Sequence, residues 1–252
     1  MMRESLFALA RSNATAATGN PHSRGRADHA VQVAGTALLA DPDGALYWAD
    51  EKLLVVADLH LEKGSALARR GVLLPPYDTA STLSRLARLV EHYAPRIVIA
   101  LGDSFHDDHG PLRMSDLDRI KLKGLQRARD WVWIAGNHDP DLPRDAGGRF
   151  ADILAIGALT FRHEPSEQPV NGEIAGHLHP VARIAQRGRA VSRRCFATDG
   201  RRLVMPAFGA YAGGLNVRDQ AIFGLFGSLT FTAHMLGAQR LYAIAAERCL
   251  AD

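Results

Sequence analysis

The fold is decided by the stretch Leu53-Leu-Val-Val-Ala-Asp-Leu-His60, in which five apolar residues run directly into polar ones. A short apolar run of this kind predicts a strand that is buried on both faces of a sheet. The same design occurs twice more along the chain, at residues 96–101 before Gly102-Asp103 and at residues 131–135 before Gly136-Asn137-His138. These three runs predict the central strands of the fold.

The segments between these strands have helical patterns. Apolar residues at helical spacing follow Asp78, which can cap a helix that continues to about residue 90. Ser115 is expected to cap a second helix that reaches about Asp130, with Asp118 as its capping-box partner. The resulting order of strand, helix, strand, helix and strand predicts parallel strands joined by crossover helices.

Shorter strands are expected on both sides of this unit. The turn signal Asp41-Pro-Asp-Gly44 separates residues 36–40 from residues 45–49 and predicts a β-hairpin. In the second half, short strands, several of them antiparallel, are expected at residues 158–161, 173–175, 181–184, 194–197 and 202–205. Residues 1–30 show little apolar periodicity and are interpreted as a loose or disordered extension, which leaves 31–252 as one domain.

Composition fits an ordinary globular protein. Hydrophobic residues make up 47% of the 252 residues and charged residues 23%, and no run approaches the roughly 20 apolar residues of a membrane helix. The N-terminal apolar stretch is too short for a signal peptide, so we expect a cytoplasmic protein. Cys195 and Cys249 lack ligand-like spacing and are expected to be free, buried thiols. The net charge of +3 would not repel a polyanion, but it does not by itself indicate a nucleic-acid binder.

The polar residues that end the strands form a set with ligand chemistry. Since ligand sites in open α/β sheets lie at the carboxyl ends of strands, these residues should meet in one crevice. Later segments add His163 and the motif Gly176-His177-Leu-His179. In an extended strand, positions i and i+2 point to the same face, so Asp58 and His60 can both face one metal, and His177 and His179 can both face the site. The complete set has seven candidate ligands, which is more than one ion needs and therefore predicts two ions. The candidates are Asp58, His60, Asp103, Asn137, His163, His177 and His179.

This ordered set resembles the calcineurin-like metallophosphoesterase superfamily over about residues 50–210. The resemblance implies a four-layer αββα sandwich, with two mixed β-sheets flanked by helices, and two divalent ions. It implies that Asp58, His60 and His179 hold one ion, that Asn137, His163 and His177 hold the other, and that Asp103 bridges them. His138 would face the leaving group. Mn²⁺ is the favoured ion, with Fe²⁺ or Zn²⁺ as alternatives, because carboxylate, imidazole and amide ligands accept all three.

A narrower resemblance points to the bacterial ligase-associated DNA damage response endonucleases of the PdeM family. It rests on residues 73–79, on Gly102-Asp-Ser-Phe-His-Asp107 and on residues 206–216. Family members are inferred to act beside a DNA ligase and a helicase, which makes DNA the expected substrate and these two proteins the expected partners. Serine/threonine phosphatases have an aspartate three positions after the bridging one. The His106 found here is similar to the SbcD nucleases and favours a phosphodiester substrate.

The mechanism implied is attack on phosphorus by a hydroxide held between two metals, with His138 as the acid and His106 orienting it or contacting the phosphate. Asp107 or Asp139 is expected to fix imidazole tautomers. The aromatic residues Tyr77, Phe208 and Tyr211 either stack on bases or pack against the sandwich.

Two other functions stay open on the sequence alone. One is a phosphodiesterase or phosphatase for a small molecule such as a nucleotide. The other is a non-catalytic metal-binding partner protein of a DNA repair complex. A deep narrow pocket would favour the small substrate, and an open basic groove would favour DNA.

Overall fold

The computed structural model of the chain describes residues 29–139 and 146–252. The predicted extension at residues 1–30 therefore lies outside the described residues, apart from its last two positions. No helix in the described ranges is long and apolar enough to cross a membrane.

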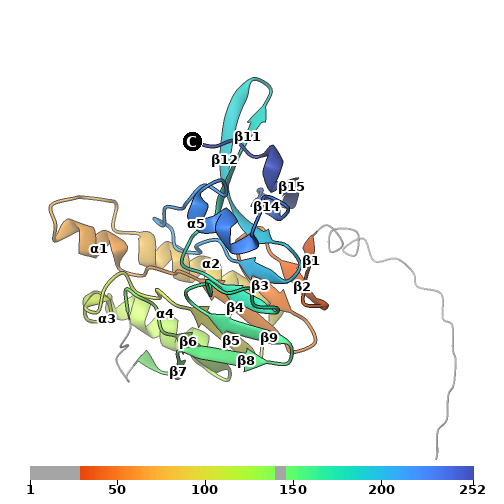
Figure 1. Ribbon diagram of the computed structural model, residues 1–252. Helices are drawn as coiled ribbons and strands as arrows, with labels where there is room; N and C mark the ends of the chain where they lie inside the picture. Colours follow the sequence, from red (N-terminus) through yellow and green to blue (C-terminus); the bar gives the residue numbers. More distant parts are fainter. Residues whose placement is uncertain (1–28, 140–145) are drawn as a thin grey trace, which may run out of the picture.

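Two mixed β-sheets form the centre of the fold (Figure 1). The first sheet has the strand order β1-β2-β3-β4-β5-β6-β7. Its strands are β1 (Ala30–Val33), β2 (Thr36–Ala40), β3 (Leu46–Trp48), β4 (Leu53–Ala57), β5 (Ile97–Leu101), β6 (Asp130–Ile134) and β7 (Arg149–Ala151). The pairs from β1 to β4 are antiparallel, and those from β4 to β7 are parallel. The predicted hairpin and the three predicted central strands are confirmed.

The second sheet has the order β15-β14-β12-β13-β10-β9-β8, and β11 pairs with β12 beside this path. Its strands are β8 (Ile153–Ile156), β9 (Leu159–Arg162), β10 (Glu173–Ala175), β11 (Val181–Gln186), β12 (Arg189–Thr198), β13 (Arg202–Val204), β14 (Thr232–Leu236) and β15 (Leu241–Ala245). β9, β10 and β13 are parallel neighbours, and the other pairs are antiparallel.

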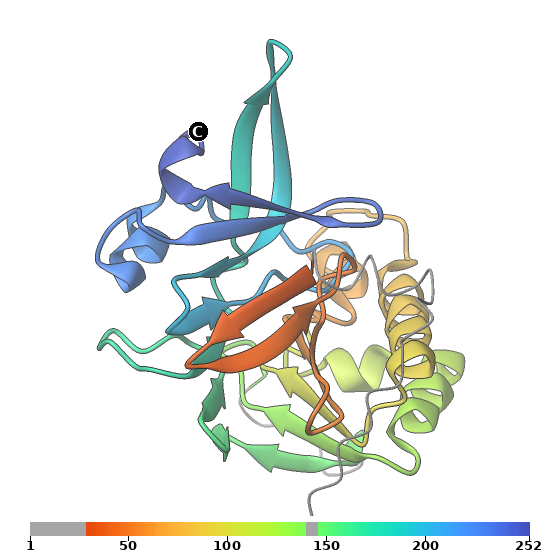
Figure 2. The ribbon, with the colours of Figure 1, turned by 90° about the vertical axis from the view of Figure 1, so that its right-hand side faces the viewer.

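Helices cover the outer faces of the two sheets, and Figure 2 shows the longer ones gathered on one side. The helices are α1 (Lys63–Ala68), α2 (Asp78–Tyr93), α3 (Gly110–Arg113), α4 (Asp116–Gln126), α5 (Gln220–Phe223), η4 (Gly224–Phe226) and η5 (Ala246–Arg248). The predicted sandwich of two mixed sheets flanked by helices is confirmed. Its fourth layer is thin, because only short helices such as α5 and η4 pack on the second sheet.

The burial of β4 shows how the sequence produces the layers. All five of its residues are buried, and they alternate between two cores. Leu53 and Val55 point into the core between the sheets, where they join Phe161 and Phe196 of the second sheet. Leu54 and Val56 point the other way, into the core beneath α2 and α4. A strand buried on both faces has no need of polar alternation, which explains its uninterrupted apolar run.

Two helix boundaries differ from expectation. Asp78 is the first residue of α2, and Tyr77, not Asp78, is its N-cap. The Asp78 carboxylate accepts a hydrogen bond from the backbone N of Gly64 at 2.9 Å. Ser115 does cap α4, and its hydroxyl accepts from the backbone N of Asp118 at 3.2 Å. That helix ends at Gln126 rather than near Asp130, because Asp130 already pairs with Ile97 in the sheet.

Candidate metal centre

The site lies where strands of both sheets end. Each of its polar residues follows the last residue of a strand: Asp58 and His60 follow β4, Asp103 follows β5, Asn137 and His138 follow β6, His163 follows β9, and His177 and His179 follow β10. Since β4, β5 and β6 are parallel, their carboxyl ends share one edge of the first sheet. β9 and β10 are parallel in the second sheet and end against the same edge.

The loops that carry these residues are left-handed rather than extended. Positive φ angles occur at Asp58 (53°), His60 (41°), Asp103 (44°), His177 (69°) and His179 (47°). The expectation of extended backbone at these positions is therefore wrong, although Asp58 and His60 do face one group of ligand atoms and His177 and His179 do face the site. Hydrogen bonds between the loops hold this backbone instead. The N of His60, for example, donates to the carbonyl of Asp103 at 2.9 Å. Strained backbone of this kind is concentrated at functional sites in proteins.

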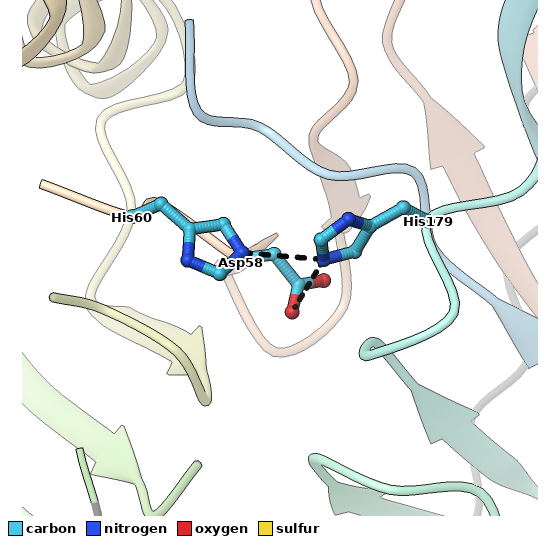
Figure 3. Close-up of side chains that lie close together, drawn as sticks. All are labelled: Asp58, His60 and His179. Atoms are coloured by element: carbon cyan, nitrogen blue, oxygen red, sulfur yellow. Dashed lines mark hydrogen bonds and ion pairs between the residues drawn. The ribbon is translucent and has the colours of Figure 1, made fainter. Parts of the chain in front are cut away.

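A first group of ligand atoms is formed by Asp58, His60 and His179 (Figure 3). The Nε2 atoms of His60 and His179 lie 3.4 Å apart, and Nε2 of His179 lies 3.3 Å from Oδ1 of Asp58. Asp58 and His60 are buried, and His179 is half-buried. Two imidazole nitrogens and a carboxylate oxygen thus point at one small volume.

A second group is formed by Asp103, His163 and His177. Nε2 of His163 lies 3.3 Å from Oδ1 of Asp103 and 3.2 Å from Nδ1 of His177. The amide oxygen of Asn137 lies 3.0 Å from the same Nε2, so this exposed side chain joins the group. The structure therefore gathers all seven residues that the sequence predicted as ligands.

Asp103 lies between the two groups. Its Oδ1 faces His163 of the second group, while its Oδ2 lies 3.9 Å from Nε2 of His60 in the first. Asp58 links the groups as well, because both of its oxygens accept from the backbone N of His177, at 3.2 and 3.1 Å. The carboxylate of Asp103 therefore turns one oxygen toward each group of ligand atoms.

Backbone carbonyls fix the orientation of two imidazoles. Nδ1 of His163 lies 3.2 Å from the carbonyl oxygen of Leu101, and Nδ1 of His138 lies 3.0 Å from that of His106. A carbonyl oxygen only accepts, so each Nδ1 carries the proton and each Nε2 offers a lone pair to the site. Such partners of the outer nitrogen are usual at metal-binding histidines.

The surroundings of His60, His106 and His177 favour the neutral imidazole. Burial, followed by the positive groups around it, lowers the pKa of His60 to about 2. Burial and then neighbouring Lys63 lower the pKa of His106, and burial and then His163 lower that of His177. Divalent metals bind neutral imidazole, so this environment suits ligands.

The donor set fits divalent cations. The Nε2 atoms of His60 and His179 face each other, and at most one of them can donate a proton to the other. A cation bound between them could accept an electron pair from both nitrogens. Carboxylate, imidazole and amide oxygen without thiolate suit ions such as Mn²⁺, Fe²⁺ or Zn²⁺.

The expected roles of Asp107 and Asp139 are wrong. Asp107 binds the guanidinium of Arg113 through both oxygens, at 2.8 and 2.9 Å. Asp139 is buried, and its Oδ2 accepts from the backbone N of Phe105 at 3.0 Å. Both carboxylates therefore hold the loop after β5 in place rather than an imidazole.

Two histidines next to the ligands line the exposed side of the site. The rings of His106 and His138 stack with centroids 5.2 Å apart, and both lie edge-on to His60. The side chain of His138 is 41% exposed, and its Nε2 lies 3.9 Å from Oδ2 of Asp103. A substrate that enters from solvent and binds at the metals would therefore contact His138.

Lys63 and Arg194 are residues near the site that the sequence did not single out. After burial, the ammonium of Lys63 contributes to the lowered pKa of His60 and of His106, which places a positive charge beside them. Arg194 donates to the carbonyls of Ala207 and Ala212, each at 2.9 Å, and so holds the segment that crosses the site. The only signal for Lys63 was its position three residues after His60.

The segment at residues 206–216 packs on the ligand loop of β4. The N of Gly209 donates to the carbonyl of Asp58 at 3.0 Å, and a Cβ on Gly209 would collide with the carbonyl of Leu59. Phe208 is fully buried beneath the guanidinium of Arg85, so it is not available to stack on a base. Tyr77 is 69% exposed and stays accessible.

An open pocket adjoins the second group of ligands. It has a volume of about 280 Å³, and it is lined by Asn137, His163, Asp152, Ile153, Arg162 and Glu164, together with the backbone of residues 135–136. Its charged lining consists of Arg162, whose guanidinium lies 3.7 Å from Glu173, and of the carboxylates of Asp152 and Glu164.

Two mixed sheets with clustered carboxylates and imidazoles at their shared edge define a metal-dependent hydrolase of phosphoesters. The model of the calcineurin-like phosphoesterase family matches residues 51–190, more than half of the chain. The chain belongs to the calcineurin-like phosphoesterase family.

Two solved structures match most of the chain. The structure of the Pseudomonas putida nuclease MPE is similar, with 25% sequence identity and a TM-score of 0.67 over 84% of this chain and 98% of that chain. Yfce, a phosphoesterase from E. coli, matches 77% of this chain and 98% of its own at 14% identity and a TM-score of 0.38. No curated protein matches the chain. The nuclease is consistent with the predicted resemblance to the PdeM family.

Proposed function

We propose that the protein is a two-metal phosphodiesterase that cleaves DNA in a repair context. The observation that carries the proposal is the carboxylate of Asp103, which turns one oxygen toward each of two groups of ligand atoms. The similarity to a nuclease supports DNA as the substrate. The structure contains more ligand atoms than one ion would use, which supports two ions.

In this proposal Asp58, His60 and His179 would hold one ion, Asn137, His163 and His177 would hold the other, and Asp103 would contact both. Mn²⁺ is the ion we favour, with Fe²⁺ or Zn²⁺ as alternatives. Bound divalent ions of this kind lower the pKa of water and neutralise charge on phosphoryl oxygens.

The chain's own contribution to the reaction is the positioning and transfer of a proton. His138 would protonate the departing oxygen from Nε2 after collecting a proton from solvent, because its Nδ1 is already engaged by the His106 carbonyl. His106 would support this ring by stacking against it. The ammonium of Lys63 would attract the phosphodiester to the metal centre.

The experiment is an assay of Mn²⁺-loaded protein on a phosphomonoester, a small phosphodiester, and single- and double-stranded DNA. We expect hydrolysis of the diesters and of DNA, with loss of both activities in Asp103→Asn protein as the control for contamination. Hydrolysis of the small diester without DNA cleavage would favour the small-molecule enzyme. Inactivity on every phosphoester would favour the non-catalytic partner protein.

The proposed repair context and the partnership with a DNA ligase and a helicase rest on the resemblance to the PdeM family. Reconstitution tests them: we expect the purified protein to bind a DNA ligase or a helicase from the same organism, in gel filtration or by calorimetry. Absence of such binding would contradict the proposed partnership but not the proposed hydrolase activity.

A further inference from the structure

A two-stranded ribbon extends beyond the second sheet, as Figures 1 and 2 both show. It consists of β11 and the first part of β12, which pair in an antiparallel register from Val181 with Arg194 to Gln186 with Arg189. β12 pairs with β13 and β14 only from Cys195 onward. Residues 189–194 of β12 therefore have β11 as their strand partner. An isolated ribbon of two strands is only marginally stable in water, so it is unlike the packed remainder of the sheet.

The ribbon is strongly basic. Residues 174–198 contain five arginines and neither aspartate nor glutamate: Arg183, Arg187, Arg189, Arg193 and Arg194. Two of these arginines form hydrogen bonds to backbone carbonyls of other segments. Arg194 holds the carbonyls of the segment over the site, and Arg183 donates to the carbonyl of Ala251 at 3.2 Å.

The three other arginines are available to a ligand. Arg187, Arg189 and Arg193 are exposed. Within residues 29–139 and 146–252 none of them lies within ion-pair distance of a carboxylate, while Arg113 and Arg202 do. Arg187 and Arg189 lie at the tip of the ribbon, and Arg193 lies near its base opposite Ala182, where it donates to the carbonyl of Ser192 at 2.9 Å. Three exposed guanidinium groups along one ribbon, without carboxylate partners, repel one another, and a bound polyanion would relieve this repulsion.

The base of the ribbon is attached to the metal centre. Pro180 alone separates the ligand residue His179 from the first residue of β11. The N of Val181 donates to the carbonyl of Leu215 at 2.8 Å, and the N of Cys195 donates to the carbonyl of Pro180 at 2.9 Å. These bonds fix the direction in which the ribbon leaves the site.

We propose that this arginine ribbon binds the phosphate backbone of the DNA that enters the metal centre. The inference rests on the proposed function and names a surface that would recognise its substrate. The six residues of β11 span about 20 Å at roughly 3.4 Å per residue. That length corresponds to about six phosphates along one strand of a duplex, at about 3.4 Å per phosphate. Arginine guanidinium groups match phosphate oxygens in geometry as well as in charge.

The test removes only the exposed charges. The variant combines Arg187→Gln, Arg189→Gln and Arg193→Gln. Its affinity for a fluorescently labelled duplex and for a single strand is measured by anisotropy at several salt concentrations, with a chelator present to prevent cleavage. We expect affinity to fall roughly tenfold or more, and the slope of log K against log salt to shrink by about 2–3.

A matched variant controls for net charge. Arg88→Gln, Arg96→Gln and Arg127→Gln remove three exposed guanidinium groups, and those of Arg96 and Arg127 precede β5 and β6 and so lie at the end of the sheet opposite the metals. Those of Arg88 and Arg96 lie 3.9 and 3.6 Å from the carboxylates of Asp43 and Glu51. We expect this control to bind DNA with nearly wild-type affinity and slope. A further ribbon variant combines Arg187→Lys, Arg189→Lys and Arg193→Lys. It keeps the positive charge and should recover most of the DNA affinity.

Hydrolysis of a small phosphodiester separates this inference from the proposed function. The ribbon variant should cleave the small diester within about twofold of wild type, which also shows that it is folded, and should cleave DNA far more slowly. Equal DNA binding and cleavage by the ribbon variant and the wild type would overturn the inference and leave the nuclease function intact. Ribbon-dependent DNA binding by a wild-type protein that never cuts DNA would overturn the nuclease function alone.

Discussion

The imidazole of His138 is fixed by the backbone of His106, because its Nδ1 donates to the His106 carbonyl oxygen at 3.0 Å. This bond leaves Nε2 directed toward the metal ligands and solvent, where a leaving group would be. The same contact joins the loops that follow β5 and β6, so the geometry of the acid depends on the packing of two parallel strands.

Replacement of this ring tests its role. In His138→Ala protein we expect the hydrolysis rate of a small phosphodiester to fall by about 10²–10⁴, the usual effect of a lost general acid. Metal content should stay close to that of the wild type. Steady-state kinetics and plasma mass spectrometry measure the two quantities. His109→Ala, which removes an exposed histidine from a neighbouring loop, should keep its activity. A His138→Ala enzyme as fast as the wild type would refute the assignment.

The number of ions is tested by removing ligands from different positions. We expect the wild type to retain two Mn²⁺ per chain after gel filtration and His179→Ala to retain about one, because the second group of ligands is untouched. Asp103→Asn should lose both, since its carboxylate faces both groups. His92→Ala, at an exposed position of α2, is the control. A wild-type protein that binds a single ion under saturating metal contradicts the two-metal centre.

Close packing at Gly102 predicts a large steric effect. Gly102 has a φ of +74°, and a Cβ there would overlap the ring of His163. Gly102→Ala should therefore lower the free energy of unfolding by well over about 1 kcal/mol and weaken metal binding. Gly124 lies in α4, and a Cβ at this position would meet no other atom within 4 Å, so Gly124→Ala should stabilise the protein by about 0.5–1 kcal/mol. Urea unfolding of both variants measures the difference, and equal stabilities would contradict the packing argument.

The buried Asp139 predicts a pH dependence of stability in metal-free protein. Burial, opposed by a hydrogen bond from Phe105, raises the pKa of this carboxyl to about 7. The folded protein therefore keeps a proton that the unfolded chain releases above about pH 4. Since the folded state binds more protons in this window, stability falls as pH rises from about 4 to about 7 and is constant above it.

Asp139→Asn removes this titration. The free energy of unfolding of the variant, relative to the wild type, should be higher at about pH 8 than at about pH 5. Urea unfolding with a chelator present gives the two values. Asp108→Asn, which changes an exposed carboxylate, should show no such difference. A constant offset between wild type and Asp139→Asn at both pH values would mean that Asp139 is already ionised in the folded protein.

Most of the central fold could be predicted from the sequence, because its signals are local. The apolar run of β4 and the turn before β3 depend on neighbouring residues, and both predictions hold. The ribbon could not be predicted in full. Strands were expected at residues 181–184 and 194–197, but the structure extends them to Gln186 and back to Arg189. Residues 185–190 at the end of the ribbon are exposed among the residues that the structure describes, so they need no apolar alternation that would identify a strand.

The sequence by itself identified the residues that the structure brings together, because ligand atoms of the right chemistry follow one strand after another. The tertiary structure decided how they are grouped. His60 and His179 are 119 residues apart, yet their nitrogens lie 3.4 Å from each other, whereas His177 joins a different group from its near neighbour His179. Local spacing cannot encode such partners. They depend on the left-handed loops and on the face-to-face packing of the two sheets, and these arise only when the whole chain has folded.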